Sequence, residues 1–188
     1  LVAGVVTAPD IIKDAGVYAD ALSSAIDLAG AFDIAADPDV GDATTVPHAT
    51  VRATANGTID YYAFDVAVAG SIGTFDIDLT SPGVDTILTL YDAAGNEIGG
   101  PQDDAGGDPG STTLRDSLLT YAFTTAGRYY VAVSSYAGGG LDYGATYTLH
   151  VSLDGAAAGS TLIGGVGDDL LVSGRGNDML DGGVDKDT

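Results

Sequence analysis

The feature that most constrains the fold is a series of short runs in which apolar and polar residues alternate with a period of two. In residues 74–79, Phe75, Ile77 and Leu79 alternate with Asp76 and Asp78. Similar runs occupy residues 60–66, 87–91, 118–123, 128–133 and 146–151, and turn residues such as Asn-Gly and Pro-Gly separate them. Strands at this spacing, without helical patterns between them, predict an all-β chain with an antiparallel β-sandwich over residues 51–153.

The segments on either side of these runs are less regular. Residues 10–29 fit either a short amphipathic helix or irregular edge structure, and we expect the short helix. An Asp- and Pro-rich loop follows at residues 35–47, and we expect the whole of residues 1–50 to belong to the sandwich or to pack on it. Residues 154–163 are rich in small residues and are typical of a linker.

The charge of the chain limits its partners. Its 188 residues include 27 acidic and 6 basic ones, which gives a formal net charge of −21. Such a chain repels phosphate backbones and anionic lipid, so we expect no nucleic-acid partner and no membrane insertion, and favour cations or neutral molecules. All acidic residues except Glu97 are aspartates, whose short side chains suit turns and calcium loops. Cysteine is absent, which excludes disulfides and thiolate metal sites.

Residues 164–188 change to a nine-residue repeat. The units begin at Gly164, Ser173 and Gly182, and the first is Gly-Gly-Val-Gly-Asp-Asp-Leu-Leu-Val. The pattern resembles the calcium-binding nonapeptides of repeats-in-toxin (RTX) proteins, in which a glycine-rich turn precedes a short strand. This resemblance implies the start of a parallel β-roll, type I secretion and an extracellular or cell-surface location. The alternative is a flexible tail rich in Gly and Asp.

The sixth position of each unit supplies a candidate calcium ligand: Asp169, Asp178 and Asp187. Successive turns of a β-roll lie on opposite sides, so Asp169 and Asp187 are expected to share one ion with the turn that contains Gly164 and Gly167. Asp178 faces the other side and needs a further turn outside residues 164–188. The third unit carries Asp185 where the pattern has Gly, so we expect weaker calcium binding there.

The central region resembles the bacterial pre-peptidase C-terminal (PPC) domain family. The resemblance spans residues 20–153 and rests on the order and spacing of several segments, among them residues 60–64, 85–95, 116–121 and 126–131. It implies a jelly-roll-like β-sandwich that accompanies secreted enzymes and adhesins, often binds calcium and is usually not catalytic itself.

Six aspartates at strand ends and in a glycine-rich loop are the candidate calcium ligands of the sandwich: Asp76, Asp78, Asp85, Asp103, Asp104 and Asp116. Clustered carboxylates repel one another unless a cation holds them, and an oxygen-only set suits Ca²⁺ better than Zn²⁺. Only Arg115 is close in sequence, and the alternative is that each aspartate is a solvated turn residue. A second acidic loop, residues 37–42, fits either another ion site or an Asx turn.

Catalytic motifs are absent from the sequence, and we predict a non-enzymatic chain. His48 and His150 are the only histidines and are expected to be hydrogen-bonding strand residues. Tyr136 and Tyr143 flank the glycine loop 137–140, where exposed rings suit a sugar or a peptide, with ordinary loop packing as the alternative. We therefore expect a monomeric, calcium-binding accessory module of a larger extracellular protein, either an adhesin domain or a structural spacer beside a secreted hydrolase.

Overall fold

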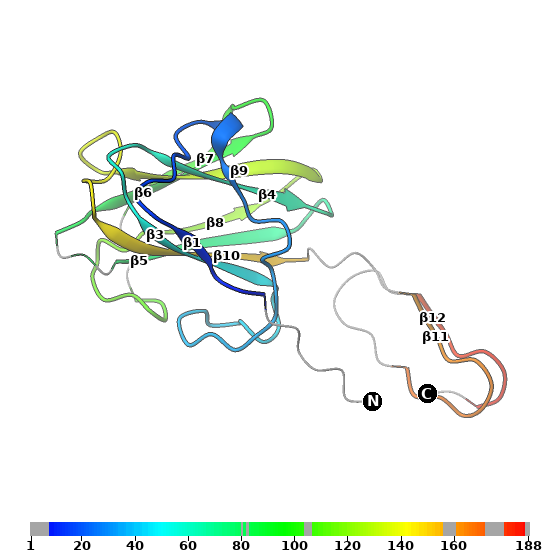
Figure 1. Ribbon diagram of the computed structural model, residues 1–188. Helices are drawn as coiled ribbons and strands as arrows, with labels where there is room; N and C mark the ends of the chain where they lie inside the picture. Colours follow the sequence, from blue (N-terminus) through cyan, green and yellow to red (C-terminus); the bar gives the residue numbers. More distant parts are fainter. Residues whose placement is uncertain are drawn as a thin grey trace.

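The computed structural model describes residues 8–79, 81, 83–103, 107–155, 161–171 and 179–186, and these residues form an all-β structure (Figure 1). The strands are β1 (Ile11–Lys13), β2 (Ile26–Asp27), β3 (His48–Thr54), β4 (Asp60–Val66), β5 (Ile72–Leu79), β6 (Thr86–Asp92), β7 (Glu97–Asp103), β8 (Leu118–Ala122), β9 (Gly127–Ser135), β10 (Thr146–Asp154), β11 (Thr161–Ile163) and β12 (Met179–Asp181). One 3₁₀ helix, η1 (Leu22–Ser24), is the helical element of the described part. Within that part, no helix has the length and apolar character needed to cross a membrane.

Two five-stranded sheets face each other and form a β-sandwich. One has the strand order β1-β3-β10-β5-β8 and the other β2-β4-β9-β6-β7, as Figure 1 shows from the side. Alternate residues of the central strands point between the sheets and form an apolar core. Its largest fully buried apolar members are Tyr62, Phe64, Phe75, Phe123 and Tyr147. The period-two alternation of the sequence therefore predicts the inward face of these strands correctly.

The strands over residues 51–153 pair antiparallel as expected, but the expected short amphipathic helix in residues 10–29 is wrong: only the three-residue 3₁₀ turn η1 is helical there. Residues 10–29 instead supply two edge strands: β1 pairs in parallel with β3, and β2 pairs in parallel with β4. Both sheets are therefore mixed. Ile11 and Ile26 pack against the core from these edges, and their β-branched side chains suit a strand better than a helix.

The outward face of the β10-containing sheet is also buried. On β5, Asp76 and Asp78 point away from the core, as the sequence predicts, yet they are only 7% and 6% exposed. The residues 33–47 and 107–117 form two loops that lie over this face (Figure 1). The loops meet where Gly41 lies beside Pro109. A Cβ at position 41 would lie 3.6 Å from Pro109 Cγ. A polar layer is thus enclosed between the sheet and its loops.

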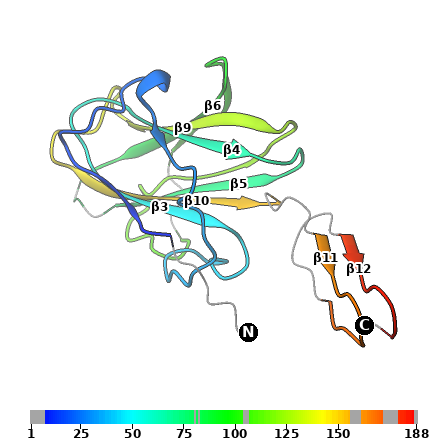
Figure 2. The same cartoon turned by 45° about the vertical axis from the view of Figure 1, so that its right-hand side comes forward.

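The C-terminal repeat region contains a separate two-stranded pair. β11 and β12 are parallel, with Thr161 opposite Met179, so the paired residues are 18 positions apart (Figure 2). The next bridge, Val166 to Val184, keeps the same offset. Asp185, which replaces the pattern's glycine, has a φ of 94°, close to the 105° of Gly167 at the equivalent position. The described part of the repeat region thus contains one parallel pair of three-residue strands, and no complete β-roll is seen in it. β11 lies within residues 154–163, which were predicted to be a linker.

Candidate functional site

The candidate site is the enclosed polar layer on the outward face of β3, β10 and β5. The strand register places His150 of β10 opposite Thr50 on one side and Asp76 on the other. A cavity of about 220 Å³ opens above this face, and its polar lining includes Asp39, Asp42, Asp76, Asp108 and His150. We call this cavity the acidic pocket. Asp78 lies next to it on β5.

Asp76 and Asp108 form the oxygen-rich part of the acidic pocket. The pKa of Asp76 is raised to about 9, mainly by burial and in addition by the hydrogen bond with Asp108 and the nearby charges of Asp108, Asp78 and Asp116. Asp76 Oδ1 and Asp108 Oδ2 are buried and have no hydrogen-bond partner among the described residues. Two neighbouring carboxyl groups that share a buried site require either a shared proton or a cation between them.

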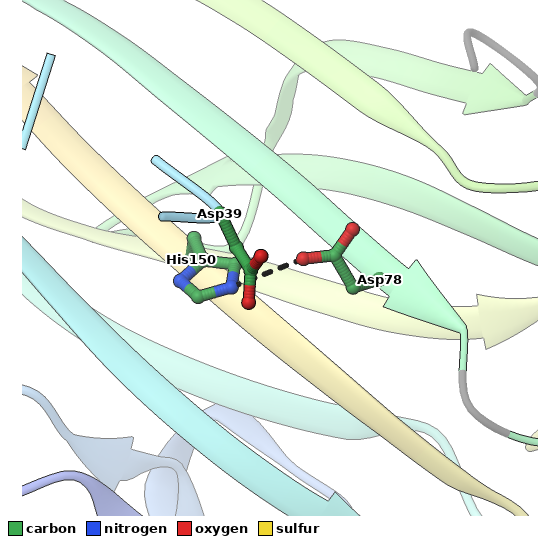
Figure 3. A group of neighbouring side chains, drawn as sticks. All are labelled: Asp39, Asp78 and His150. Carbon is green, nitrogen blue, oxygen red and sulfur yellow. Dashed lines mark ion pairs between the residues drawn. The ribbon is translucent and has the colours of Figure 1, made fainter. Parts of the chain in front are cut away.

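The other part of the acidic pocket joins a histidine to two carboxylates (Figure 3). His150 Nε2 lies 3.2 Å from Asp78 Oδ2, and Asp39 approaches from the loop, so that one ligand atom from each residue lies within 4.8 Å of the others. Burial raises the pKa of Asp78, the charges of Asp39 and Asp108 add to this, and His150 opposes it. Both carboxylate oxygens of Asp78 are buried without a hydrogen bond among the described residues.

No lysine or arginine side chain is seen to neutralise this group of acids in the described part of the chain. The ion pairs of the lysines and arginines go to other carboxylates: Lys13 to Asp60, Arg52 to Asp10, Arg115 to Asp85, and Arg128 to Asp27 and Asp65. Buried carboxylates that lack a counter-ion are either protonated or bound to a metal. The acidic pocket therefore has the composition of a cation site.

The structure distributes the six aspartates predicted for the sandwich over several places. Asp116 is near Asp76, but its carboxylate accepts hydrogen bonds from the Thr112 amide and the Thr113 hydroxyl, at 2.8 and 2.7 Å, and so holds its own turn. Asp85 lies 4.0 Å from Arg115 and lines a different cavity. Asp103 ends β7 opposite Ile87, and Asp104 lies outside the described residues.

In the repeats, the turns that follow β11 and β12 contact each other. The Gly167 amide donates to Asp185 Oδ2 at 3.1 Å, and the Lys186 amide donates to Asp168 Oδ1 at 3.1 Å. The Asp169 side chain folds back on its own turn. Its Oδ2 lies so close to Gly164 that a Cβ at position 164 would be only 2.7 Å away. The other two predicted repeat ligands, Asp178 and Asp187, lie outside the described residues.

The two tyrosines proposed as ligand contacts are on the surface. Tyr136 and Tyr143 are 62% and 76% exposed. Tyr136 lines a cavity of about 310 Å³ together with Asp85, Arg115 and Asp142. An exposed ring beside charged groups is a suitable surface for a polar ligand.

Sequence reasoning missed two residues of the acidic pocket, Asp108 and His150, as site residues, and considered Asp39 only as part of the 37–42 loop. His150 was predicted only as a hydrogen-bonding strand residue, and its bond to Thr50 is present. The 37–42 loop does contain the Asx turn that was considered, since the Asp39 amide donates to Asp37 Oδ1 at 3.0 Å. The sequence does place His150 on the polar face of its strand. Only the pairing of β10 with β5, however, shows that His150 lies beside Asp76 and Asp78.

The loop glycine at position 110 is expected to be essential for the shape of the acidic pocket. Its φ is 92°, and a Cβ there would lie 2.3 Å from Asp78 Oδ2. Gly110→Ala should therefore lower the melting temperature more than Gly138→Ala, whose φ of 91° is equally strained but whose Cβ meets nothing within 4 Å. Equal losses in the two variants, measured by thermal unfolding, would show that the contact with Asp78 is unimportant.

Comparison with known proteins gives little further information. No protein-family model matches the chain, and no curated protein matches it. Among solved structures, the chain is similar to PliG of Aeromonas hydrophila, a periplasmic inhibitor of g-type lysozyme. The two share 16% sequence identity over 78% of this chain and 100% of the other, with a TM-score of 0.37. A likeness this distant carries no argument about the site.

Proposed function

We propose that the chain is a calcium-binding, non-catalytic accessory module of an extracellular RTX protein. The observation that carries the proposal is the buried Asp76, hydrogen-bonded to Asp108 and next to Asp78, with no lysine or arginine partner seen among the described residues. Ca²⁺ prefers carboxylate and carbonyl oxygens, takes six to eight of them, and replaces the proton that this pair otherwise needs. The acidic pocket supplies carboxylates from two loops and one strand.

The repeat region supports the RTX part of the proposal. The offset of 18 residues between β11 and β12 equals two nonapeptide units, which is the separation expected for turns on the same side of a β-roll. The contacts between the turns at Gly167 and Lys186 keep this offset. In this proposal a polyanionic chain remains loosely folded where calcium is scarce, and folds outside the cell when calcium neutralises its carboxylates.

Calcium should raise the melting temperature of the chain strongly. When the calcium concentration is about 100 times the dissociation constant of one site, binding adds about 2.7 kcal/mol to the free energy of unfolding. This corresponds to a rise in melting temperature of roughly 5–10 °C for a chain of this size. The measurement is thermal unfolding in EDTA and in excess calcium, with calorimetric titration of the stripped protein. An unchanged melting temperature would refute the proposal.

Variants separate the sandwich from the repeats. Asp76→Asn and Asp108→Asn should each remove the tighter binding event, whereas Asp169→Asn should remove only a weaker one. Asp14→Asn, an exposed aspartate outside the acidic pocket, is the matched control and should bind as the parent chain does. Tight binding that survives both acidic-pocket variants would contradict the sandwich site.

The Tyr136 cavity favours an adhesin role over that of a spacer. Its exposed ring lies beside Arg115 and Asp142, a combination that suits the apolar face and hydroxyl groups of a sugar. A glycan-array screen of the parent chain and of Tyr136→Ala tests this candidate. Binding that is lost in the variant supports an adhesin domain, and the absence of any hit favours the structural spacer of a secreted hydrolase.

A further inference from the structure

The two nitrogens of His150 have different surroundings. Nδ1 lies 3.0 Å from the Thr50 hydroxyl, and that hydroxyl donates its hydrogen to Asp37 Oδ2 at 3.3 Å. A carboxylate only accepts, so the single Thr50 hydrogen is directed to Asp37 and the Thr50 oxygen accepts from Nδ1. Nδ1 therefore carries a hydrogen, and in the neutral ring Nε2 presents a lone pair.

The Nε2 side of the ring has no donor to accept from. The residue is 2% exposed, and Nε2 forms no hydrogen bond among the described residues. It points at Asp78 and Asp39, whose oxygens are also acceptors (Figure 3). A buried nitrogen lone pair that faces two carboxylates is unfavourable unless a positive species lies between them.

We propose that His150 Nε2, Asp39 and Asp78 bind a divalent transition-metal ion of the Zn²⁺ type. One imidazole with two carboxylates is a donor set that Zn²⁺ accepts, whereas Ca²⁺ takes oxygen ligands. The two hydrogen bonds that lead from Nδ1 through the Thr50 hydroxyl to Asp37 are the kind of outer-shell contact that fixes the tautomer of a metal-binding histidine. This site adjoins the calcium site proposed at Asp76 and Asp108 in the same acidic pocket, and its assignment does not depend on calcium binding there.

The dimensions of the group fit this assignment. The three ligand atoms lie within 4.8 Å of one another. Zn²⁺ with bonds of about 2.0–2.1 Å needs tetrahedral ligands roughly 3.4 Å apart, so closure requires shifts on the order of 1 Å. Asp39 is on a loop and half-buried, so its side chain is placed to make that movement. Asp39 and His150 also line the acidic pocket, which leaves room for water as a further ligand.

The test is titration of the EDTA-stripped and dialysed full chain with Zn²⁺, in the presence of excess calcium. We expect one site that His150→Gln weakens at least 100-fold, while Asp14→Asn, at an exposed aspartate outside the acidic pocket, leaves it within a few-fold. His48→Gln is the matched control, because His48 is the other histidine and is buried on the neighbouring strand. Loss of zinc binding in His48→Gln with retention in His150→Gln would overturn the assignment.

Two further measurements keep the proposal testable if His150→Gln folds poorly. Asp39→Asn changes only a loop ligand and should also weaken zinc binding, and Thr50→Val should weaken it by roughly 10-fold through the outer shell. In the parent chain, Co²⁺ should give visible absorption bands of a nitrogen-ligated site. The proposal is overturned if the parent chain takes up neither ion, or if nitrogen NMR shows His150 doubly protonated and unchanged by added Zn²⁺, since the group would then be a simple ion pair.

Discussion

Replacing Lys13 with alanine is expected to destabilise the sandwich by about 3–5 kcal/mol, because it leaves a buried carboxylate without its partner. Lys13 Nζ lies 3.0 Å from Asp60 Oδ1 and donates to the Thr54 carbonyl at 3.1 Å. Asp60 Oδ2 accepts a hydrogen bond of 2.7 Å from the Tyr147 hydroxyl. This buried network connects β1 in one sheet to β4 in the other, so its loss should loosen the N-terminal strand as well.

Urea denaturation measures this effect. Arg52→Ala is the matched control, because Arg52 forms an ion pair of 2.8 Å with Asp10 in which both side chains are exposed to solvent. That pair should contribute only about 0–1 kcal/mol. The double variant Lys13→Met/Asp60→Leu should be more stable than Lys13→Ala, since it leaves no unpaired buried charge. If Lys13→Ala and Arg52→Ala lose equal stability, the buried pair does not hold β1 in place.

Asp76→Asn is expected to stabilise the metal-free chain increasingly as the pH rises. The pKa of Asp76 is raised from 3.8 to about 9, mainly by burial, so the folded state keeps a proton that the unfolded state releases near pH 4. Between these values the unfolded state binds one proton fewer, and the free energy of unfolding falls by about 1.4 kcal/mol per pH unit. Asparagine has no proton to lose, so the variant escapes this fall.

The experiment is urea denaturation of both chains in EDTA between pH 5 and pH 8. The difference in stability should widen with pH in favour of the variant, and Asp14→Asn should show no such trend. Excess calcium should restore stability to the parent chain at pH 8 but not to Asp76→Asn, because only an ionised Asp76 is a ligand. Parallel pH profiles of the parent and Asp76→Asn would show that Asp76 is ionised in the metal-free fold.

Which side chains come together in the candidate site depends on the tertiary structure. Asp76 and Asp78 were identified from their alternation with Phe75, Ile77 and Leu79, but their burial depends on loops that are distant in sequence. Asp85 was grouped with them because it begins the next strand, yet that strand belongs to the opposite sheet and places it beside Arg115. Sequence proximity to a strand end does not specify which sheet, or which edge, receives the side chain.

The sequence by itself determined the class of fold and the inward face of the central strands, because side chains alternate with period two in any strand whatever its neighbours are. It did not determine the edges. β1 and β2 are too short to give a periodic signal, and β7 contains two glycines and a proline, which an edge strand tolerates. Nor did it determine that His150 lies between Thr50 and Asp76, since that neighbourhood exists only when β10 pairs with both β3 and β5. Local pattern fixes which way a side chain points, whereas strand order fixes what it meets.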